Sequence, residues 1–187
     1  MQIRFLRTLV VAALSLTASQ LPAVTPASHF SDHMVLQRDA KVPIWGTADP
    51  GAKVMVSFAG QTVSGQADKA GNWRVELAPM AASAKNRDLT IQGGGRTKTL
   101  KNVLVGEVWV GSGQSNMAGA VSGYAKNDPT LAELVAAAPY PTMRLLRGGP
   151  KPNWTPADKV NIPRFSAILF AFGERLHRDL KVPVGLI

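Results

Sequence analysis

The 187-residue chain contains no cysteine. This absence excludes disulfide scaffolds, thiolate zinc sites, iron–sulfur centres and cysteine nucleophiles. Charged residues are scarce at 18%, against 45% hydrophobic residues, which excludes a disordered tail and a charge-rich coiled coil. The chain also has no internal repeat and only three histidines, so few side chains could act as a base near neutral pH.

Acidic residues are outnumbered, with 12 Asp and Glu against 21 Lys and Arg, and the formal charge is +9. The excess is spread along the chain: +2 in residues 1–20, +3 in residues 21–100 and +4 in residues 101–187. No segment gathers basic residues with interleaved aromatics, as a groove that follows phosphates requires. The charge therefore predicts a solvated, mildly basic surface and no nucleic-acid partner.

Residues 1–20 have the pattern of a secretory signal peptide. Arg4 and Arg7 are followed by an uncharged run over residues 8–18, and small residues surround Ala18. The run is shorter than the roughly 20 apolar residues that span a membrane. We expect a secreted or periplasmic protein that is not membrane-bound in its mature form; an uncleaved anchor or a buried helix is the alternative.

Residues 21–101 predict a β-rich module. Val54, Val56 and Phe58 alternate with polar positions, and residues 73–77 show the same period of two. Turn signals at residues 68–71 and 93–95 separate such runs. Short strands at this spacing are typical of a small antiparallel sandwich. Trp45 and Trp73 could be platforms for sugars, but the alternation favours core packing.

Residues 102–187 predict strands alternating with helices. Apolar runs at residues 103–105 and 108–110 are typical of buried strands, as are residues 143–146 and 184–187. Helices are expected over residues 131–138 and again after Pro163. In the second helix, Gly173 would permit close approach to a sheet, and six apolar residues define one face: Phe165, Ile168, Leu169, Phe172, Leu176 and Leu180. The alternation predicts parallel strand pairing with right-handed crossovers.

Ser115 is the best candidate for chemistry. It follows the run at residues 108–110 in a glycine-rich turn, near the expected carboxyl edge of the sheet. A serine held there can present its Oγ as a nucleophile, and its own backbone N–H can help to bind an oxyanion. Gly113, Gln114 and Asn116 are its motif neighbours. A structural turn that caps a helix is the alternative interpretation of this pattern.

The segment Gly106–Met117, with its Gly-Gln-Ser-Asn-Met core, resembles the motif of the sialate O-acetylesterase family within the SGNH-type hydrolases. Further similarity lies at residues 30–38, 42–51, 71–73 and 165–187. The resemblance implies an α/β fold in which a β-sandwich-like N-terminal module, residues 21–101, is followed by an incomplete SGNH-type parallel-sheet hydrolase domain, residues 102–187.

The resemblance also implies an activity: hydrolysis of O-acetyl groups on sialic acid or related acetylated sugars. Ser115 matches the nucleophile, its backbone N–H would contribute to the oxyanion hole, and Asn116 is interpreted as a structural neighbour. The mechanism is acyl transfer through an acetyl-enzyme. No metal and no organic cofactor is implied, the expected partner is an acetylated sugar or sialoglycan, and the oligomeric state stays open.

The expected general base is missing from the chain. In the family it comes from a later Asp-x-x-His segment, and the other oxyanion donors, a glycine and an asparagine, also come later. His29, His33 and His177 are interpreted as surface or packing residues. We therefore expect an N-terminal part of a longer enzyme, with little esterase activity alone. The alternatives are a non-catalytic carbohydrate-binding or interaction module and an unstable fragment without function.

Overall fold

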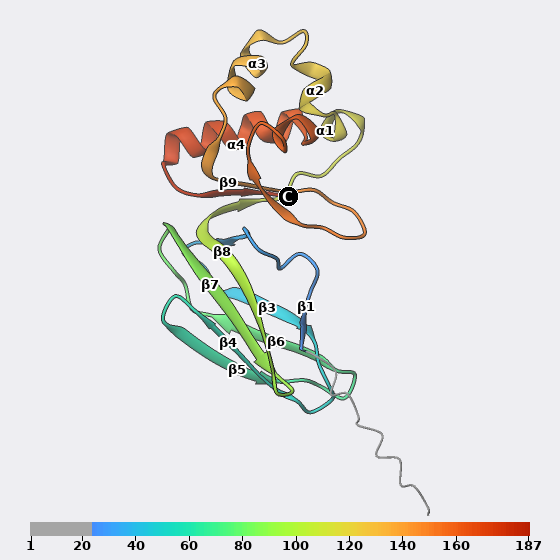
Figure 1. Ribbon diagram of the computed structural model, residues 1–187, viewed down its shortest axis with the longest axis vertical. Helices are drawn as coiled ribbons and strands as arrows, with labels where there is room; N and C mark the ends of the chain where they lie inside the picture. The colour runs from blue at the N-terminus through green and yellow to red at the C-terminus, as the bar shows by residue number, and fades with distance from the viewer. Residues whose placement is uncertain (1–23) are drawn as a thin grey trace, which may run out of the picture.

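The computed structural model describes residues 24–187, and the signal peptide predicted at residues 1–20 lies outside the described residues (Figure 1). Within residues 24–187 the strands form two sheets. The three-stranded sheet has the order β1-β3-β6, with β1 at Thr25–Pro26, β3 at Val42–Thr47 and β6 at Asn72–Leu77. No helix of the described part is long and apolar enough to cross a membrane.

The second sheet has eight strands in the order β10-β9-β11-β8-β7-β4-β5, with β2 paired beside β8. Its strands are β2 Val35–Gln37, β4 Lys53–Phe58, β5 Gln61–Gln66, β7 Ser83–Gly93, β8 Arg96–Trp109, β9 Tyr140–Leu146, β10 Trp154–Ala157 and β11 Val184–Leu186. The described helices are α1 Ser115–Ala118, α2 Val121–Tyr124, α3 Pro129–Ala136, the 3-10 helix η1 Ile162–Arg164 and α4 Ala167–Leu180. The predicted α/β class is confirmed as a mixed fold, mostly sheet with few helices.

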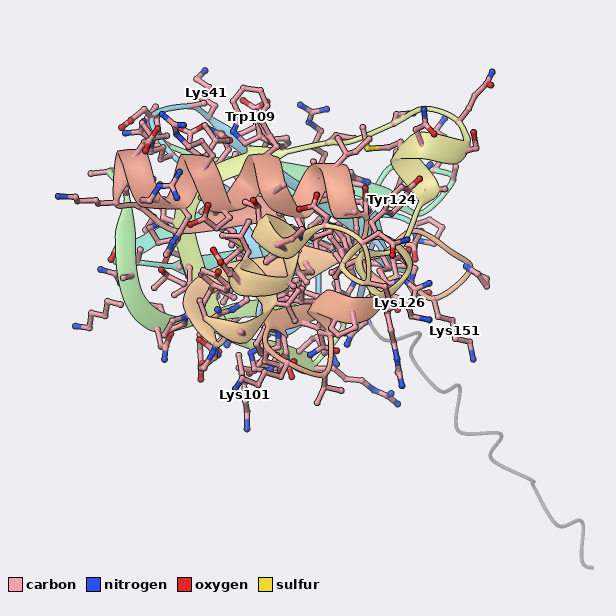
Figure 2. All side chains as sticks on the ribbon, turned by 90° about the horizontal axis from the view of Figure 1, so that it is seen from above. Lys41, Lys101, Trp109, Tyr124, Lys126 and Lys151 are labelled. Carbon is pink, nitrogen blue, oxygen red and sulfur yellow. The ribbon has the colours of Figure 1, made fainter. Side chains whose placement is uncertain are left out.

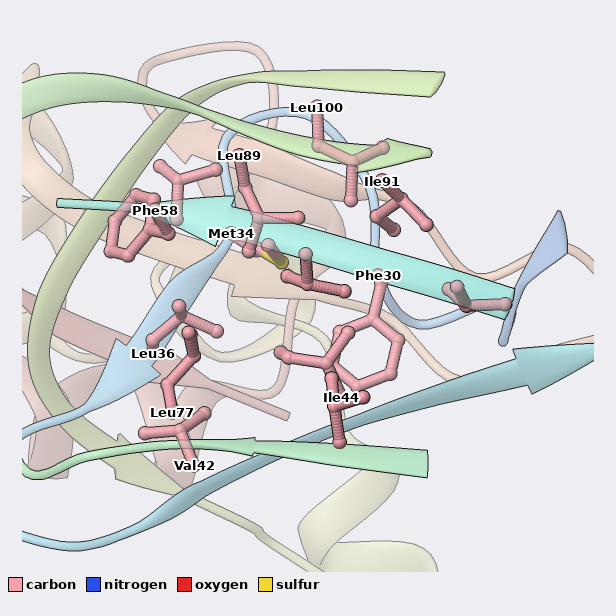
Figure 3. Packing of buried hydrophobic residues seen from close by; sticks show 14 of the residues in the cluster. Phe30, Met34, Leu36, Val42, Ile44, Phe58, Leu77, Leu89, Ile91 and Leu100 are labelled. Carbon is pink, nitrogen blue, oxygen red and sulfur yellow. The ribbon is translucent and has the colours of Figure 1, made fainter. Parts of the chain in front are cut away.

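The period-two runs form strands with one buried face, as predicted. Val54, Val56 and Phe58 of β4 are at most 2% exposed. The alternate residues of β3 and β6 pack with them in one hydrophobic core, so the three-stranded sheet faces the β4–β7–β8 part of the larger sheet. Figure 3 shows Ile44 and Leu77 on one side of this core, Leu89 on the other, and Met34 between them.

Trp45 and Trp73 differ in burial. Trp73 points inward from β6 and is 2% exposed, so the prediction of core packing is correct there. The same prediction is wrong for Trp45, which is 38% exposed. The inward positions of β3 are Val42 and Ile44, and because side chains alternate along a strand, Trp45 lies on the outer face.

Strand β8 runs through both halves of the molecule (Figure 1). The two apolar runs at residues 103–105 and 108–110 largely belong to this one strand, which ends at Trp109. Its first part pairs antiparallel with β7, and its last part pairs parallel with β11, which in turn pairs parallel with β9. The predicted parallel pairing is thus present. The boundary predicted between residues 101 and 102 lies inside β8, and the division into two domains stays a prediction.

The described helices lie together on one face of the parallel strands (Figure 1). The opposite face packs on the β-rich half, because Leu146 of β9 and Trp154 of β10 belong to that core. Strand β10 was not expected from the sequence, and it pairs antiparallel with β9. The β-rich half therefore takes the place of a second helical layer.

Helix α4 buries a different face from the predicted one. Phe165 and Leu169 are buried as expected and Leu176 packs against the same core, but Ile168, Phe172 and Leu180 are 50%, 40% and 43% exposed. The buried face contains Phe170 and Gly173 instead. A Cβ at residue 173 would lie 2.4 Å from Cδ1 of Leu186, so the missing side chain lets β11 approach the helix as predicted. This contact turns the helix away from its more apolar stripe.

Candidate active site

Ser115 lies beyond the carboxyl end of β8, where the parallel strands end. The Gly111 N–H donates to the Ile187 carbonyl over 2.7 Å, which extends the β8–β11 ladder past Trp109. The chain then turns through Gly113, whose φ of +154° is rarely adopted by other residues, and Ser115 opens the short helix α1. The turn thus exposes Ser115 to solvent at the predicted edge.

The start of α4 holds α1 in place. The Ala167 N–H donates to the Gly119 carbonyl over 2.9 Å, and the Ser166 hydroxyl lies 3.6 Å from Sδ of Met117. The same hydroxyl accepts the Leu169 N–H and caps α4. A rigid helix therefore positions the segment that carries Ser115.

A hollow of about 410 Å³ opens next to this segment, between α1, α2, α3 and α4. Asn116 lines it, which places it beside the candidate nucleophile. The other lining residues are mostly apolar: Tyr124, Asp128, Thr130, Leu131, Leu134, Ala167, Ile168 and Ala171. Sequence reasoning missed Tyr124 and Ile168 as site residues, because Tyr124 lies outside the motif segments and the sequence predicts Ile168 on the buried face of its helix. A volume of this size suits a small organic group with one sugar ring.

Two of the motif segments that resemble the esterase family meet in space. Strand β2, within residues 30–38, pairs parallel with β8. The Arg38 Nε donates to Oε1 of Glu107 over 2.6 Å, and Glu107 raises the pKa of Arg38 mainly through this hydrogen bond. Oε1 of Gln37 accepts the Val108 N–H over 2.9 Å. Arg38 and Gln37 thus secure the end of the strand that leads to Ser115.

Two histidines are held in hydrogen bonds elsewhere. His177 Nε2 and Thr142 Oγ1 form a hydrogen bond of 2.8 Å, and burial lowers the pKa of His177. Eleven helical residues separate Ser166 from His177, a distance of about 16 Å along α4. His33 Nδ1 lies 2.7 Å from Asn102 Nδ2, and about 23 Å of strand separates Asn102 from Trp109. Neither imidazole lies at the turn that carries Ser115.

His29 is held in an aromatic cluster. Its ring lies 4.4 Å from Phe30 and 4.6 Å from Trp45, measured between ring centroids, and burial lowers its pKa. Across residues 24–187, none of the three histidines hydrogen-bonds to Ser115. The same part of the chain contains no group of three or more His, Asp or Glu side chains that could hold a metal ion. Within residues 24–187 the structure therefore places no imidazole at the turn that carries Ser115.

A serine exposed in a glycine-containing turn after a parallel strand is an arrangement found in α/β hydrolytic enzymes. The chain is similar to the sialate O-acetylesterases of Homo sapiens and Mus musculus, with 30% and 29% identity over 86% of the chain. The predicted relationship to the sialate O-acetylesterase family is thereby confirmed. The matched region is 36% and 34% of those two proteins, so the chain spans about a third of the length of these curated relatives.

A solved structure supports the same relationship. A carbohydrate acetylesterase from Xanthomonas citri has a TM-score of 0.76 and 30% sequence identity, and the match covers 87% of this chain and 39% of that one. No model of a known protein family matches the chain. The fold similarity therefore extends over most of the chain.

Proposed function

We propose that the chain is the nucleophile-bearing part of a serine esterase that removes O-acetyl groups from sialic acid or related acetylated sugars. The observation that carries this proposal is the position of Ser115: it opens α1 just beyond the carboxyl end of β8. The names of the similar proteins support an acetylated carbohydrate as the substrate.

The proposed reaction is acyl transfer. Oγ of Ser115 attacks the acetyl carbonyl, a base accepts the serine proton, and the backbone N–H of Ser115 stabilises the oxyanion. The sugar oxygen leaves, and water then releases acetate from the acetyl-enzyme. The hollow beside Asn116 and Tyr124 would accept the acetylated part of the substrate. The reaction needs neither a metal nor an organic cofactor.

We propose that this chain lacks a general base beside Ser115. General-base catalysis contributes about 10²–10⁴-fold to such reactions. Because His29, His33 and His177 lie in other contacts, we infer that the chain alone is a slow esterase. In this proposal, the base belongs to the Asp-x-x-His segment of the family pattern, and the remaining oxyanion donors, a glycine and an asparagine, belong to other later segments.

The architecture that accompanies this function is a β-sandwich-like module over residues 21–101 and the N-terminal part of an SGNH-type hydrolase domain over residues 102–187. The shared core between β3, β6 and the β4–β7–β8 strands supports the sandwich. The parallel β8–β11–β9 pairing supports the hydrolase domain. Residues 1–20 would direct export to the periplasm or the medium.

A fluorophosphonate probe tests whether Ser115 is the reactive serine. Ser112, Ser115 and Ser122 all lie between Lys101 and Lys126, so trypsin places them in one peptide. With imidazole supplied as a base, we expect the adduct on Ser115, and we expect Ser115→Ala to remove it. Ser122→Ala is the matched control and should label normally. An equal distribution over the three serines would show that no hydrolase site is formed.

The second candidate function is a non-catalytic carbohydrate-binding module. The exposed indole of Trp45 favours it, because a large aromatic side chain on the surface is a common contact for ligands. Glycan binding by a chain without any fluorophosphonate adduct would support this alternative over the esterase.

A further inference from the structure

A shallow hollow of about 490 Å³ lies on the outer face of the three-stranded sheet, well apart in sequence from Ser115. Its lining comes from β3, β6 and the turn before β6: Pro43, Trp45, Gly46, Asp68, Asn72, Trp73 and Arg74. In the β3–β6 register, Trp45 lies opposite Arg74. Trp73 is only 2% exposed, so the hollow combines the exposed ring of Trp45 with the polar side chains of Asp68, Asn72 and Arg74.

Contacts on one side hold the Trp45 ring in place. The ring centroid of Phe30 lies 4.8 Å away in an edge-on arrangement, and that of His29 lies 4.6 Å away. The backbone N–H of Ala27 donates to the Trp45 carbonyl over 2.9 Å. The indole is therefore ordered before any ligand binds, although 38% of the residue is exposed. An ordered aromatic surface loses little conformational entropy on binding.

The polar groups of the hollow are also held in position. Oδ1 of Asp68 accepts the N–H groups of Ala70 and Asn72, each over 2.8 Å. The bond from Asn72 is the largest cause of the lowered pKa of Asp68, so the carboxylate stays ionised. Its Oδ2 has only a long 3.5 Å contact with Nδ2 of Asn72. An acceptor oxygen and an amide are thus available to a ligand.

Arg74 shares the carboxylate of Glu76 with Lys41. Its Nη2 donates to Oε1 of Glu76 over 3.1 Å, and Lys41 lies 4.0 Å from the other Glu76 oxygen. The remaining guanidinium N–H groups make no further hydrogen bond within residues 24–187. With the Asp68 carboxylate in the same hollow, these four side chains carry no formal net charge, so Arg74 offers donors in a site that favours an uncharged ligand.

From these groups we propose that the hollow around Trp45 is a second, non-catalytic site for an uncharged pyranose unit of a glycan. The apolar face of the sugar ring would lie on the indole of Trp45. Its hydroxyl groups would donate to Asp68 and accept from Asn72 and Arg74. This site shares no residue with the hollow beside Asn116, so it does not depend on the proposed esterase activity.

Binding at this hollow can be tested by NMR, because two of the four tryptophans, Trp109 and Trp154, lie outside it and serve as internal controls. The four indole N–H groups give separate signals in a ¹H–¹⁵N correlation spectrum, and Trp45→Phe assigns that of Trp45. On titration with xylohexaose, a neutral pyranose chain, we expect the Trp45 signal to shift with saturation. The signals of Trp109 and Trp154, which do not line the hollow, should stay in place. Trp109, 42% exposed beside Phe172, is the matched surface control (Figure 2).

Variants separate this site from the catalytic one. Trp45→Ala should weaken xylohexaose binding by about tenfold, a loss of about 1.4 kcal/mol, because the apolar face of the sugar ring loses its contact with the indole. Trp109→Ala and Ser115→Ala should bind like the unchanged chain. No saturable shift, a shift at Trp109 instead, or a stronger response to N-acetylneuraminic acid than to xylohexaose would overturn the proposal.

Discussion

Imidazole should raise the Ser115-dependent hydrolysis of 4-nitrophenyl acetate by this chain about tenfold or more. A positioned base contributes about 10²–10⁴-fold to such a reaction, and a free base in solution recovers part of that factor. Ser115 is exposed, so imidazole can reach its hydroxyl. None of the three histidines of the chain takes that place, because His33 and His177 bond elsewhere and His29 lies in an aromatic cluster.

The matched control for this experiment is Ser112→Ala, an exposed serine in the same turn. It should respond to imidazole like the unchanged chain, whereas Ser115→Ala should show only the reaction of imidazole itself. A high rate without imidazole that Ser115→Ala abolishes would show that a base is already in place, and the proposal of a slow esterase would then be wrong.

Phe170→Ala should lower the free energy of unfolding by about 3–5 kcal/mol, as the removal of a buried aromatic ring does. Phe170 is fully buried in α4, and its ring centroid lies 5.8 Å from that of Tyr140. Phe172→Ala removes the same atoms two residues later in the same helix. Because Phe172 is 40% exposed, this variant should cost about 1 kcal/mol.

Urea denaturation of the two variants and the unchanged chain measures this difference. A larger loss for Phe172→Ala than for Phe170→Ala would mean that α4 buries the stripe expected from its sequence. Equal losses would mean that both faces are covered in solution. Either result would contradict the orientation of α4 against β11.

Strands with one buried face are predictable from the sequence, because apolar and polar residues alternate along them with a period of two. In β4 and β6 a single core covers one face, so buried residues such as Val54 and Val75 alternate with less buried ones and the strands are recognisable. The turns around Gly71 and Gly95 are likewise local, since each residue has a positive φ. These features follow from neighbouring residues alone.

Other features depend on contacts between distant segments. The face that α4 buries follows from the close contact of Gly173 with Leu186. The exposure of Trp45 follows from its outward-facing position in β3. Strand β10 forms only because it pairs with β9, so its short sequence carries little signal. Such pairings need the three-dimensional fold before they can be seen.

The candidate site was predictable to a similar extent. The glycine-rich motif after an apolar run predicts Ser115 at the strand end, and the structure places it there. The hollow beside it was not predictable, because Tyr124 and Ile168 come together only when α2 and α4 pack.

The labelled Lys41 and Lys101 project on opposite sides in Figure 2, which agrees with the even spread of charge.

The most direct test of the central claim is to find the acetyl group on Ser115. The chain is incubated with 4-nitrophenyl acetate and imidazole, quenched in acid and digested, and the peptide that carries Ser112, Ser115 and Ser122 is sequenced by mass spectrometry. We predict acetylation of Ser115, with Ser112 and Ser122 unmodified. Acetyl groups on the other two serines to the same extent, or ester hydrolysis that Ser115→Ala leaves unchanged, would contradict the assignment of Ser115 as the nucleophile.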